Sequence, residues 1–309
     1  MIIEFHNHVH LPEWAARPYW QGKCPMVIDN VLRVNEEAGV DLFVISNPLH
    51  ELRGMDRKGQ LETVKQLNRY FAEMQSRHAG KLVAMAGCVA TGGDEFLKEL
   101  ERAIKVDGLK GVMITSSVNG EYPDDDAALP FFKLVSDLDV PVIMHPPSVG
   151  FGEERMKDYR LASSVGRPFD NSLALARLIV RGIFEKFPTL KLVATHLGGG
   201  ISEMIGRLDY AYELQEEAYF LGPYEPMMIK KKPSEYLKMA YLDCVCYHLP
   251  AARCAMETVG VDHFVFGTDA PPLWPLKRKG IDLIDQLGLS SSDKDKIMSG
   301  NAKRLLKLT

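Results

Sequence analysis

The sequence predicts a (β/α)8 TIM barrel, in which eight parallel strands alternate with helices over 309 residues. Short apolar runs recur along the chain, and segments with a helical pattern of apolar residues lie between them. Most runs are aliphatic or β-branched at consecutive positions, as in parallel strands that helices bury on both faces. The strand starts recur about every 37 residues between positions 1 and 263, which is the repeat length of such a barrel.

Eight apolar runs form the predicted strands. They are residues 1–5, 41–45, 81–87, 111–115, 140–145, 190–196, 240–246 and 263–268. A doubly wound open sheet is the alternative architecture, and it usually carries a glycine-rich phosphate turn after its first strand. Here the first strand leads into His6, Asn7 and His8 instead, which favours the barrel.

The helices expected between these strands each carry an apolar stripe. In the first of them, Val27, Val31 and Val34 fall on or beside one stripe, and Gly39 follows as the C-cap. The expected helices are 26–38, 60–78, 95–105, 127–138 and 171–187, with a closing helix in the tail 293–308.

No linker divides the chain, so we predict one barrel domain over residues 1–309. Its richest glycine, proline and charged segment, 146–170, directly follows the fifth strand, and a second excursion, 215–240, precedes the seventh. Loops after the carboxyl ends of strands build the catalytic face of a barrel. Segment 146–170 is therefore predicted to be an active-site loop insertion.

Composition and charge argue against several classes of protein. The 37 basic and 41 acidic residues give a net charge of −4, which disfavours nucleic acid or an anionic membrane as partner. No apolar run reaches the roughly 18 residues of a membrane-spanning helix, and the first residues lack the pattern of a secretory signal. Five cysteines, an odd number, are expected to be reduced thiols in a cytoplasmic protein.

Side chains with metal-coordinating atoms end four of the predicted strands. His6 and His8 follow the first strand, His145 ends the fifth, His196 ends the sixth and Asp269 follows the eighth. A barrel gathers these strand ends in one ring, and positions i and i+2 of a strand point to the same side. Imidazole and carboxylate donors in this number suit a catalytic ion with one open position.

Each motif has a plainer interpretation when taken alone. A single His-x-His pair is common, and His8 and His10 have the same spacing as His6 and His8. Asp269 precedes two prolines and could cap a turn. Because such residues occur at four strand ends together, we predict a metal site, with His10 as an alternative partner of His8.

The spread of these motifs resembles the amidohydrolase superfamily, and within it the branch of aminocarboxymuconate semialdehyde decarboxylase and the resorcylate-type decarboxylases. The resemblance covers the whole chain and is most specific over residues 165–210, with VGRPFD, GIFEKFP, LKLVATHLGGG and the pair Gly206–Arg207. The segments IEFHNHVHLPEW, VIMHPP, FGTDAP and GNAKRLLKL fit the same pattern. The acid that opens the family's D-x-H-x-H motif is Glu4 here.

The resemblance implies one divalent ion, zinc in the first place and manganese in some members, held by His6, His8, His145 and Asp269. It implies that His196 is the acid/base or water-orienting residue. Superfamily members with two ions bridge them by a lysine at the end of the fourth strand. Here that strand, GVMIT, ends without a lysine, which favours a single ion.

The predicted function is the non-oxidative decarboxylation of a small aromatic or unsaturated carboxylic acid, with His196 managing the proton. The alternative is a metal-dependent hydrolase or hydratase, in which activated water attacks a lactone, an amide or a related electrophile. In that reaction Asp269 and His196 would take the proton. A barrel that only binds a ligand or a partner is the third hypothesis, and it predicts no catalytic metal.

Four side chains are candidates for contact with the substrate. Arg17 and Arg53, in loops after the first and second strands, could bind a carboxylate bidentately. Phe169, in the loop after the fifth strand, could stack on a ring. By the resemblance, Arg207 matches an arginine that reaches the neighbouring subunit's site, which implies a homodimer or higher homo-oligomer. The plainer interpretations are solvated or packed loop side chains and, for Arg207, an ion pair within the chain.

Overall fold

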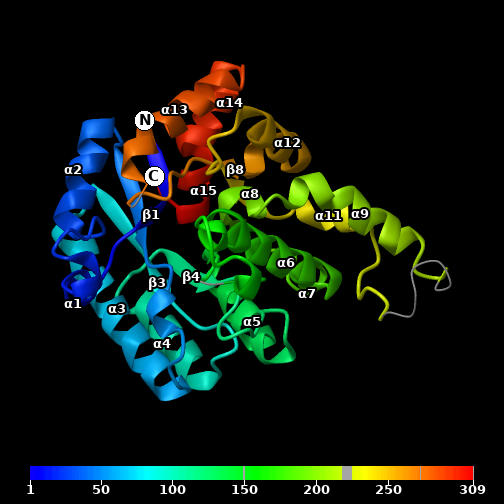
Figure 1. The fold of residues 1–309 in the computed structure, drawn as a ribbon, viewed down its shortest axis with the longest axis horizontal. Coiled ribbons are helices and arrows are strands. Elements are labelled where there is room, and N and C mark those ends of the chain that lie inside the picture. The colour runs from blue at the N-terminus through cyan, green and yellow to red at the C-terminus, as the bar shows by residue number, and fades with distance from the viewer. Residues whose placement is uncertain (149, 218–224, 272, 309) are drawn as a thin grey trace.

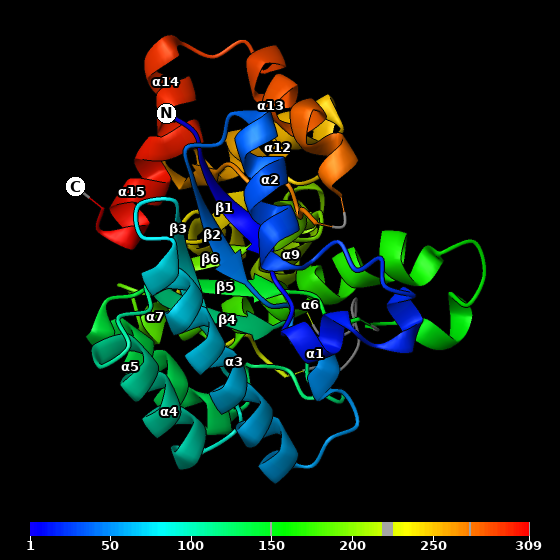
Figure 2. The ribbon, with the colours of Figure 1, turned by 90° about the vertical axis from the view of Figure 1, so that its left-hand side faces the viewer.

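The computed structural model describes residues 1–148, 150–217, 225–271 and 273–308. Eight parallel strands form one sheet in which each strand pairs with the next along the chain (Figure 2). The strands are β1 (Ile3–His8), β2 (Leu42–Ser46), β3 (Leu82–Gly87), β4 (Gly111–Thr115), β5 (Val142–His145), β6 (Leu192–Ala194), β7 (Tyr241–Asp243) and β8 (Phe264–Val265). Each of the eight predicted runs overlaps one of them, and the (β/α)8 prediction is confirmed.

Hydrogen bonds between β1 and the segment that follows β8 nearly close the barrel. The amide of Phe5 donates to the carbonyl of Phe266 at 2.8 Å, and the amide of His8 donates to that of Ala270 at 2.9 Å. The first predicted strand ends at residue 5, but β1 continues through His8, so His6 and His8 belong to the strand itself. A register shift between Glu4 and Asn7 accompanies this longer strand.

The helices surround the strands (Figures 1 and 2). They are α1 (Pro12–Ala15), α2 (Ile28–Ala38), α3 (Arg57–Arg77), α4 (Asp94–Lys105), α5 (Leu129–Leu138), α6 (Arg167–Val180), α7 (Ile183–Lys186), α8 (Thr195–Gly198), α9 (Ile201–Glu213), α11 (Pro233–Leu237), α12 (Leu249–Val259), α13 (Lys277–Gln286), α14 (Ser291–Asp295) and α15 (Asn301–Leu306). The predicted helix 171–187 is wrong at its start and in its continuity, because α6 begins at Arg167 and the chain turns at Gly182 before α7.

Two apolar cores hold the strands in place. A large core packs the outer faces of the strands against the helices, and a smaller one fills the barrel interior. The interior core includes Ile3 and Leu42, the first residues of β1 and β2, together with Leu305 and Leu306 of α15. The C-terminal helix thus covers the amino ends of the strands, and the opposite end is left to the loops that carry polar residues.

The loops at the carboxyl ends of β1 and β5 project together from the barrel, as Figure 2 shows. Segment 146–170 lies between β5 and the first turn of α6. Residues 218–224 of the excursion expected before β7 lie outside the described residues. In the part of the chain that the structure describes, no helix has both the length and the apolar character that crossing a membrane requires.

A buried carboxylate joins α3, α4 and β3. Asn68 accepts a hydrogen bond from the amide of Gly87 at 2.8 Å and donates one to Glu99 at 3.0 Å. Arg102 donates from Nε and Nη2 to the two oxygens of Glu99, both at 2.8 Å. Burial alone would raise the pKa of Glu99, but Arg102 and Asn68 outweigh it and hold that pKa below its ordinary value of 4.5.

We therefore expect Glu99→Gln to lower the free energy of unfolding by about 1–3 kcal/mol at pH 7. Because the folded-state pKa is depressed, the contribution is complete above the unfolded value of 4.5 and is lost as pH falls from there through the folded-state pKa. Urea titrations at pH 7 and pH 3 would measure both free energies. The exposed Glu101→Gln is the control and should change little. An equal loss for Glu99→Gln at the two pH values would contradict the prediction.

Candidate active site

Four imidazoles and one carboxylate converge at the carboxyl ends of four strands. Oδ1 of Asp269 lies 3.0 Å from Nε2 of His8, 3.4 Å from Nε2 of His6 and 3.7 Å from Nε2 of His145. Nε2 of His196 lies 3.4 Å from Nε2 of His145. The structure therefore brings together all five residues of the predicted metal and catalytic set, which we call the cluster.

Three of the imidazoles are held by hydrogen bonds on the side away from the centre. Nδ1 of His6 donates to Oδ2 of Asp243 at 2.5 Å, and Nδ1 of His145 donates to the carbonyl of Pro146 at 2.8 Å. Nδ1 of His8 lies 3.4 Å from Oγ of Ser46. Since the Ser46 hydroxyl itself donates to the carbonyl of Asn7, it is an acceptor for His8. These partners leave the Nε2 atom of each ring facing the centre.

The charge state of the cluster suits a cation. Burial lowers the pKa values of His8, His145 and His196, which favours neutral imidazoles at pH 7. Burial would raise the pKa of Asp269, but hydrogen bonds from His145, His6 and His8 outweigh it and keep that pKa well below its usual range. Burial also lowers the pKa of His6, but Asp243 outweighs it and raises this pKa to about 10. Protons and a metal ion therefore compete at His6, and the affinity of the site for metal should decrease as the pH is lowered.

The donor set fits one divalent ion. Ligand atoms of His6, His145, His196 and Asp269 all lie within 4.8 Å of one another. Nε2 of His8 lies 3.0 Å from Oδ1 of Asp269. The outward hydrogen bonds of His6, His8 and His145 are typical of metal-bound histidines. No described residue hydrogen-bonds Nδ1 of His196. Within the part of the chain that the structure describes, three imidazoles thus have an outward hydrogen bond and the fourth, His196, has none.

A left-handed turn positions His196. The φ angles are positive from His196, at 54°, through Leu197 and the three following glycines to Gly200, at 89°. This conformation is costly for residues with a side chain. A Cβ atom at Gly199 would lie 1.9 Å from the carbonyl oxygen of Pro168 at the start of α6. The glycines therefore let α6 approach the turn, which directs His196 to the cluster. Asp269 also has a positive φ, at 57°.

Glu4 lies outside the cluster, between the barrel and its helices. Its carboxylate is fully buried and accepts hydrogen bonds from Asn7, Thr268 and Lys277. Lys277, the first residue of α13, also donates to Asn35 of α2 at 3.0 Å. Because Thr268 precedes Asp269, this buried ion pair fixes the segment that delivers Asp269 to the centre.

Two further histidines lie beside the cluster. His10, the alternative partner of His8, faces Glu51 at 3.6 Å and Asn47 at 3.1 Å rather than Asp269. The geometry thus pairs His6, not His10, with His8. His50 was not among the residues predicted for the site. Its ring centroid lies 5.9 Å from that of His145, and its Nε2 lies 3.4 Å from the carbonyl oxygen of Pro146.

The four substrate-contact candidates lie at different distances from the chemistry. Arg17 is exposed, with its guanidinium 5.9 Å from the ring of Trp14, and Phe169 is half exposed. Arg53 pairs with Glu153 at 3.0 Å. Arg207 is exposed on α9, with its guanidinium 5.3 Å from the ring of Tyr210. The described contacts of these four side chains include none with the cluster.

Sequence reasoning missed Asp243 and Arg167. Asp243 ends β7 within an apolar run and is fully buried. An acid in such a run needs a partner, and this was the signal in the sequence that could have indicated its role. Arg167 belongs to the VGRPFD segment, but nothing in the sequence shows which loop arginine turns inwards. In the structure the charge of Arg167 affects the pKa values of His196 and His50.

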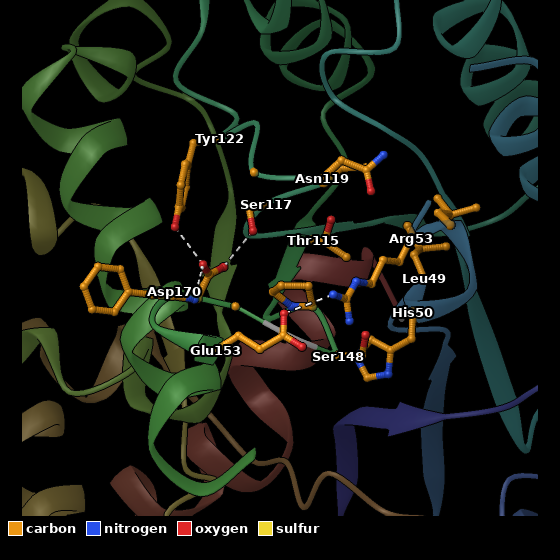
Figure 3. Close-up of a pocket in the computed structure, with 16 residues that line it drawn as sticks. Leu49, His50, Arg53, Thr115, Ser117, Asn119, Tyr122, Ser148, Glu153 and Asp170 are labelled. Atoms are coloured by element: carbon orange, nitrogen blue, oxygen red, sulfur yellow. Dashed lines mark hydrogen bonds and ion pairs between the residues drawn. The ribbon is translucent and has the colours of Figure 1, made fainter. Parts of the chain in front are cut away.

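A cavity of about 310 Å³ lies beside the cluster, over the ends of β2, β4 and β5 (Figure 3). Its wall includes His50 and Thr115, the register partner of His145, but no residue of the cluster itself. The Arg53–Glu153 ion pair lies at one side. Opposite, the buried Asp170 accepts hydrogen bonds from Ser117 at 3.0 Å and from the Tyr122 hydroxyl at 2.7 Å. Its volume is at the small end of ligand sites.

Comparison with known families agrees with this arrangement. The model of the amidohydrolase family matches residues 3–308 of the chain. The chain belongs to the amidohydrolase family. A 2-amino-3-carboxymuconate-6-semialdehyde decarboxylase of Dictyostelium discoideum is 28% identical over 250 residues, which are 80% of this chain and 67% of the relative. A gamma-resorcylate decarboxylase of Polaromonas sp. is 24% identical over 298 residues, 91% of this chain and 87% of the relative.

Solved structures share the fold of this amidohydrolase. A 5-carboxyvanillate decarboxylase from Novosphingobium aromaticivorans, crystallised with manganese and 4-hydroxy-3-methoxy-5-nitrobenzoic acid, superimposes with a TM-score of 0.87 at 19% identity. The match covers 100% of this chain and 96% of that one. At this identity the comparison establishes the barrel architecture that the sequence predicted.

We expect Asp243→Asn to weaken metal binding by about 10- to 100-fold, because His6 loses the carboxylate that orients its ring and raises its basicity. Competition with a chromogenic chelator would measure the dissociation constants for zinc and manganese. Asp262→Asn, which alters an exposed carboxylate paired with Lys296, is the control. An Asp243→Asn protein that melts normally and binds both metals like the wild type would contradict the prediction.

Proposed function

We propose that this amidohydrolase is a metal-dependent, non-oxidative decarboxylase of a small aromatic or unsaturated carboxylic acid. The observation that carries the proposal is the cluster, in which the three imidazoles with outward hydrogen bonds and Asp269 face one point while His196 lies beside them. The cavity bounded by His50 has room for a ring-sized acid. The family match and the decarboxylase names of both relatives support the same reaction.

His6, His8, His145 and Asp269 would hold the ion, and zinc or manganese suits imidazole and carboxylate donors. Manganese in the Novosphingobium structure supports the second metal. When bound, the ion would act as a Lewis acid toward substrate oxygen atoms. Elemental analysis of protein purified without chelator, beside His145→Ala, would identify it.

His196 would manage the proton in this reaction. Decarboxylation breaks the bond between the carboxylate and its carbon, releases CO2 and places a proton on that carbon. The His196 ring lies 5.2 Å from those of both His6 and His145, and no described residue hydrogen-bonds its Nδ1. Because burial lowers its pKa, the ring is neutral at pH 7, so it would first accept a proton from water or from a substrate hydroxyl and then deliver it to that carbon.

The proposal includes the substrate-binding roles that the sequence predicts for Arg17, Arg53, Phe169 and Arg207. Arg53 has the strongest support, because it lines the cavity and a substrate carboxylate could replace its exposed partner Glu153.

All five cysteines are free thiols, which supports the proposed cytoplasmic location.

The proposal is tested by release of CO2 from a panel of hydroxybenzoic and enoic acids. We expect turnover to require metal, and His196→Asn to lower kcat by about 100-fold or more while metal content is unchanged. His78→Asn, distant from the cluster, is the matched control. Loss of metal from His196→Asn would make His196 a ligand instead. Consumption of water without CO2 release would favour the hydrolase or hydratase.

We also propose that Arg207 completes the site of a second copy of the chain. Its exposure on α9, away from its own cluster, supports this role. Arg207→Ala and His196→Asn should each be inactive alone. Co-expressed, they should recover about a quarter of wild-type activity, because half of the random dimers contain one intact site. No recovery in dimers confirmed by sedimentation would contradict the proposal.

A further inference from the structure

The first turn of α6 lies between the ends of β5 and β6. Nδ2 of Asn171 donates to the carbonyl of Thr195 at 2.6 Å, and the Thr195 hydroxyl donates to the carbonyl of Met144 at 3.1 Å. On the other side, Oδ1 of Asp170 accepts a hydrogen bond from the amide of Phe151 at 3.1 Å. These contacts fix the helix start beside His145 and His196.

Arg167 is the first residue of α6 and therefore lies at this junction. Its Nε donates to the carbonyl of Ser148, three residues after His145, at 3.2 Å. The next residue, Pro168, contacts the turn at Gly199, three residues after His196. Arg167 is thus joined by its side chain to the segment after His145, and its neighbour Pro168 packs against the turn after His196.

The guanidinium of Arg167 lacks a carboxylate partner. Within the described residues, its Nε–Ser148 hydrogen bond is its one hydrogen bond, and no ion pair includes it. The side chain is half-buried, in contrast to Arg53, which is 56% exposed and already paired with Glu153. Burial lowers the pKa of Arg167, and the charge of Asp269 partly offsets this effect. A half-buried guanidinium without an anionic partner destabilises the folded protein unless a ligand supplies the anion.

We infer that Arg167 binds the carboxylate, or another anionic oxygen, of the substrate at the edge of the cluster. This inference rests on the proposed function and names the cation that receives the acid. The two Nη atoms form a fork with no described partner, and a carboxylate accepts two parallel hydrogen bonds from such a fork. Arg167 is thus a specificity-determining residue that selects an anion over a neutral substrate.

Calorimetric titration of the manganese-loaded protein tests the inference. The probes are 2,6-dihydroxybenzoate and cis,cis-muconate, with 2,6-dihydroxybenzamide as the neutral analogue. We expect Arg167→Met to weaken binding of the acids by about 10- to 100-fold and to leave the amide affinity nearly unchanged. Arg167→Lys should restore part of the loss, because it returns the charge without the fork. Arg155→Met, 86% exposed in the same segment, is the matched control.

Two outcomes overturn the inference without affecting the proposed decarboxylase. One is an Arg167→Met protein that binds the acids as tightly as the wild type. The other is an equal loss of affinity for the acids and for the amide, together with a lower melting temperature. That result would show that Arg167 only holds the Ser148 segment in place. Wild-type protein that binds metal but neither acid, and releases no CO2 from the panel, would overturn the inference and the proposed function together. Metal content is measured for every variant.

Discussion

The hydrogen bonds that the cluster imidazoles make away from its centre determine what the site can hold. His6 is fixed by Asp243, His145 by the carbonyl of Pro146 and His8 by the Ser46 hydroxyl. Each bond holds a proton on Nδ1 and so directs an Nε2 atom inwards, where it can bind metal once it is unprotonated. Because the partners come from β7, from the end of β5 and from β2, the tautomers depend on an assembled barrel.

Backbone conformation supplies the second constraint. His196 and Asp269 both have left-handed φ angles, which the protein maintains through packing around them. At His196 the glycines of the turn permit close contact with α6, and at Asp269 the buried Glu4–Lys277 pair fixes the preceding threonine. The same packing that stabilises the barrel therefore orients the two residues expected to manage protons.

The loop after β5 joins the cluster to the cavity. It supplies Pro146, which fixes His145, then Glu153, which pairs with Arg53, and finally Arg167 at the start of α6. The buried Asp170 holds this loop through the amide of Phe151. One loop can thus set both the position of a metal ligand and the polarity of the space beside it.

The sequence by itself determined the barrel and the cluster residues, because strand periodicity is local and strand ends must meet in a ring. It missed the extension of β1 through His8 and the early start of α6, since both depend on tertiary packing. Only the tertiary structure decided that Asp243 supports His6, that His10 turns to Glu51 and that Arg167 bonds the segment after His145. These contacts join positions far apart in the chain or depend on side-chain direction, and neither follows from spacing in the sequence.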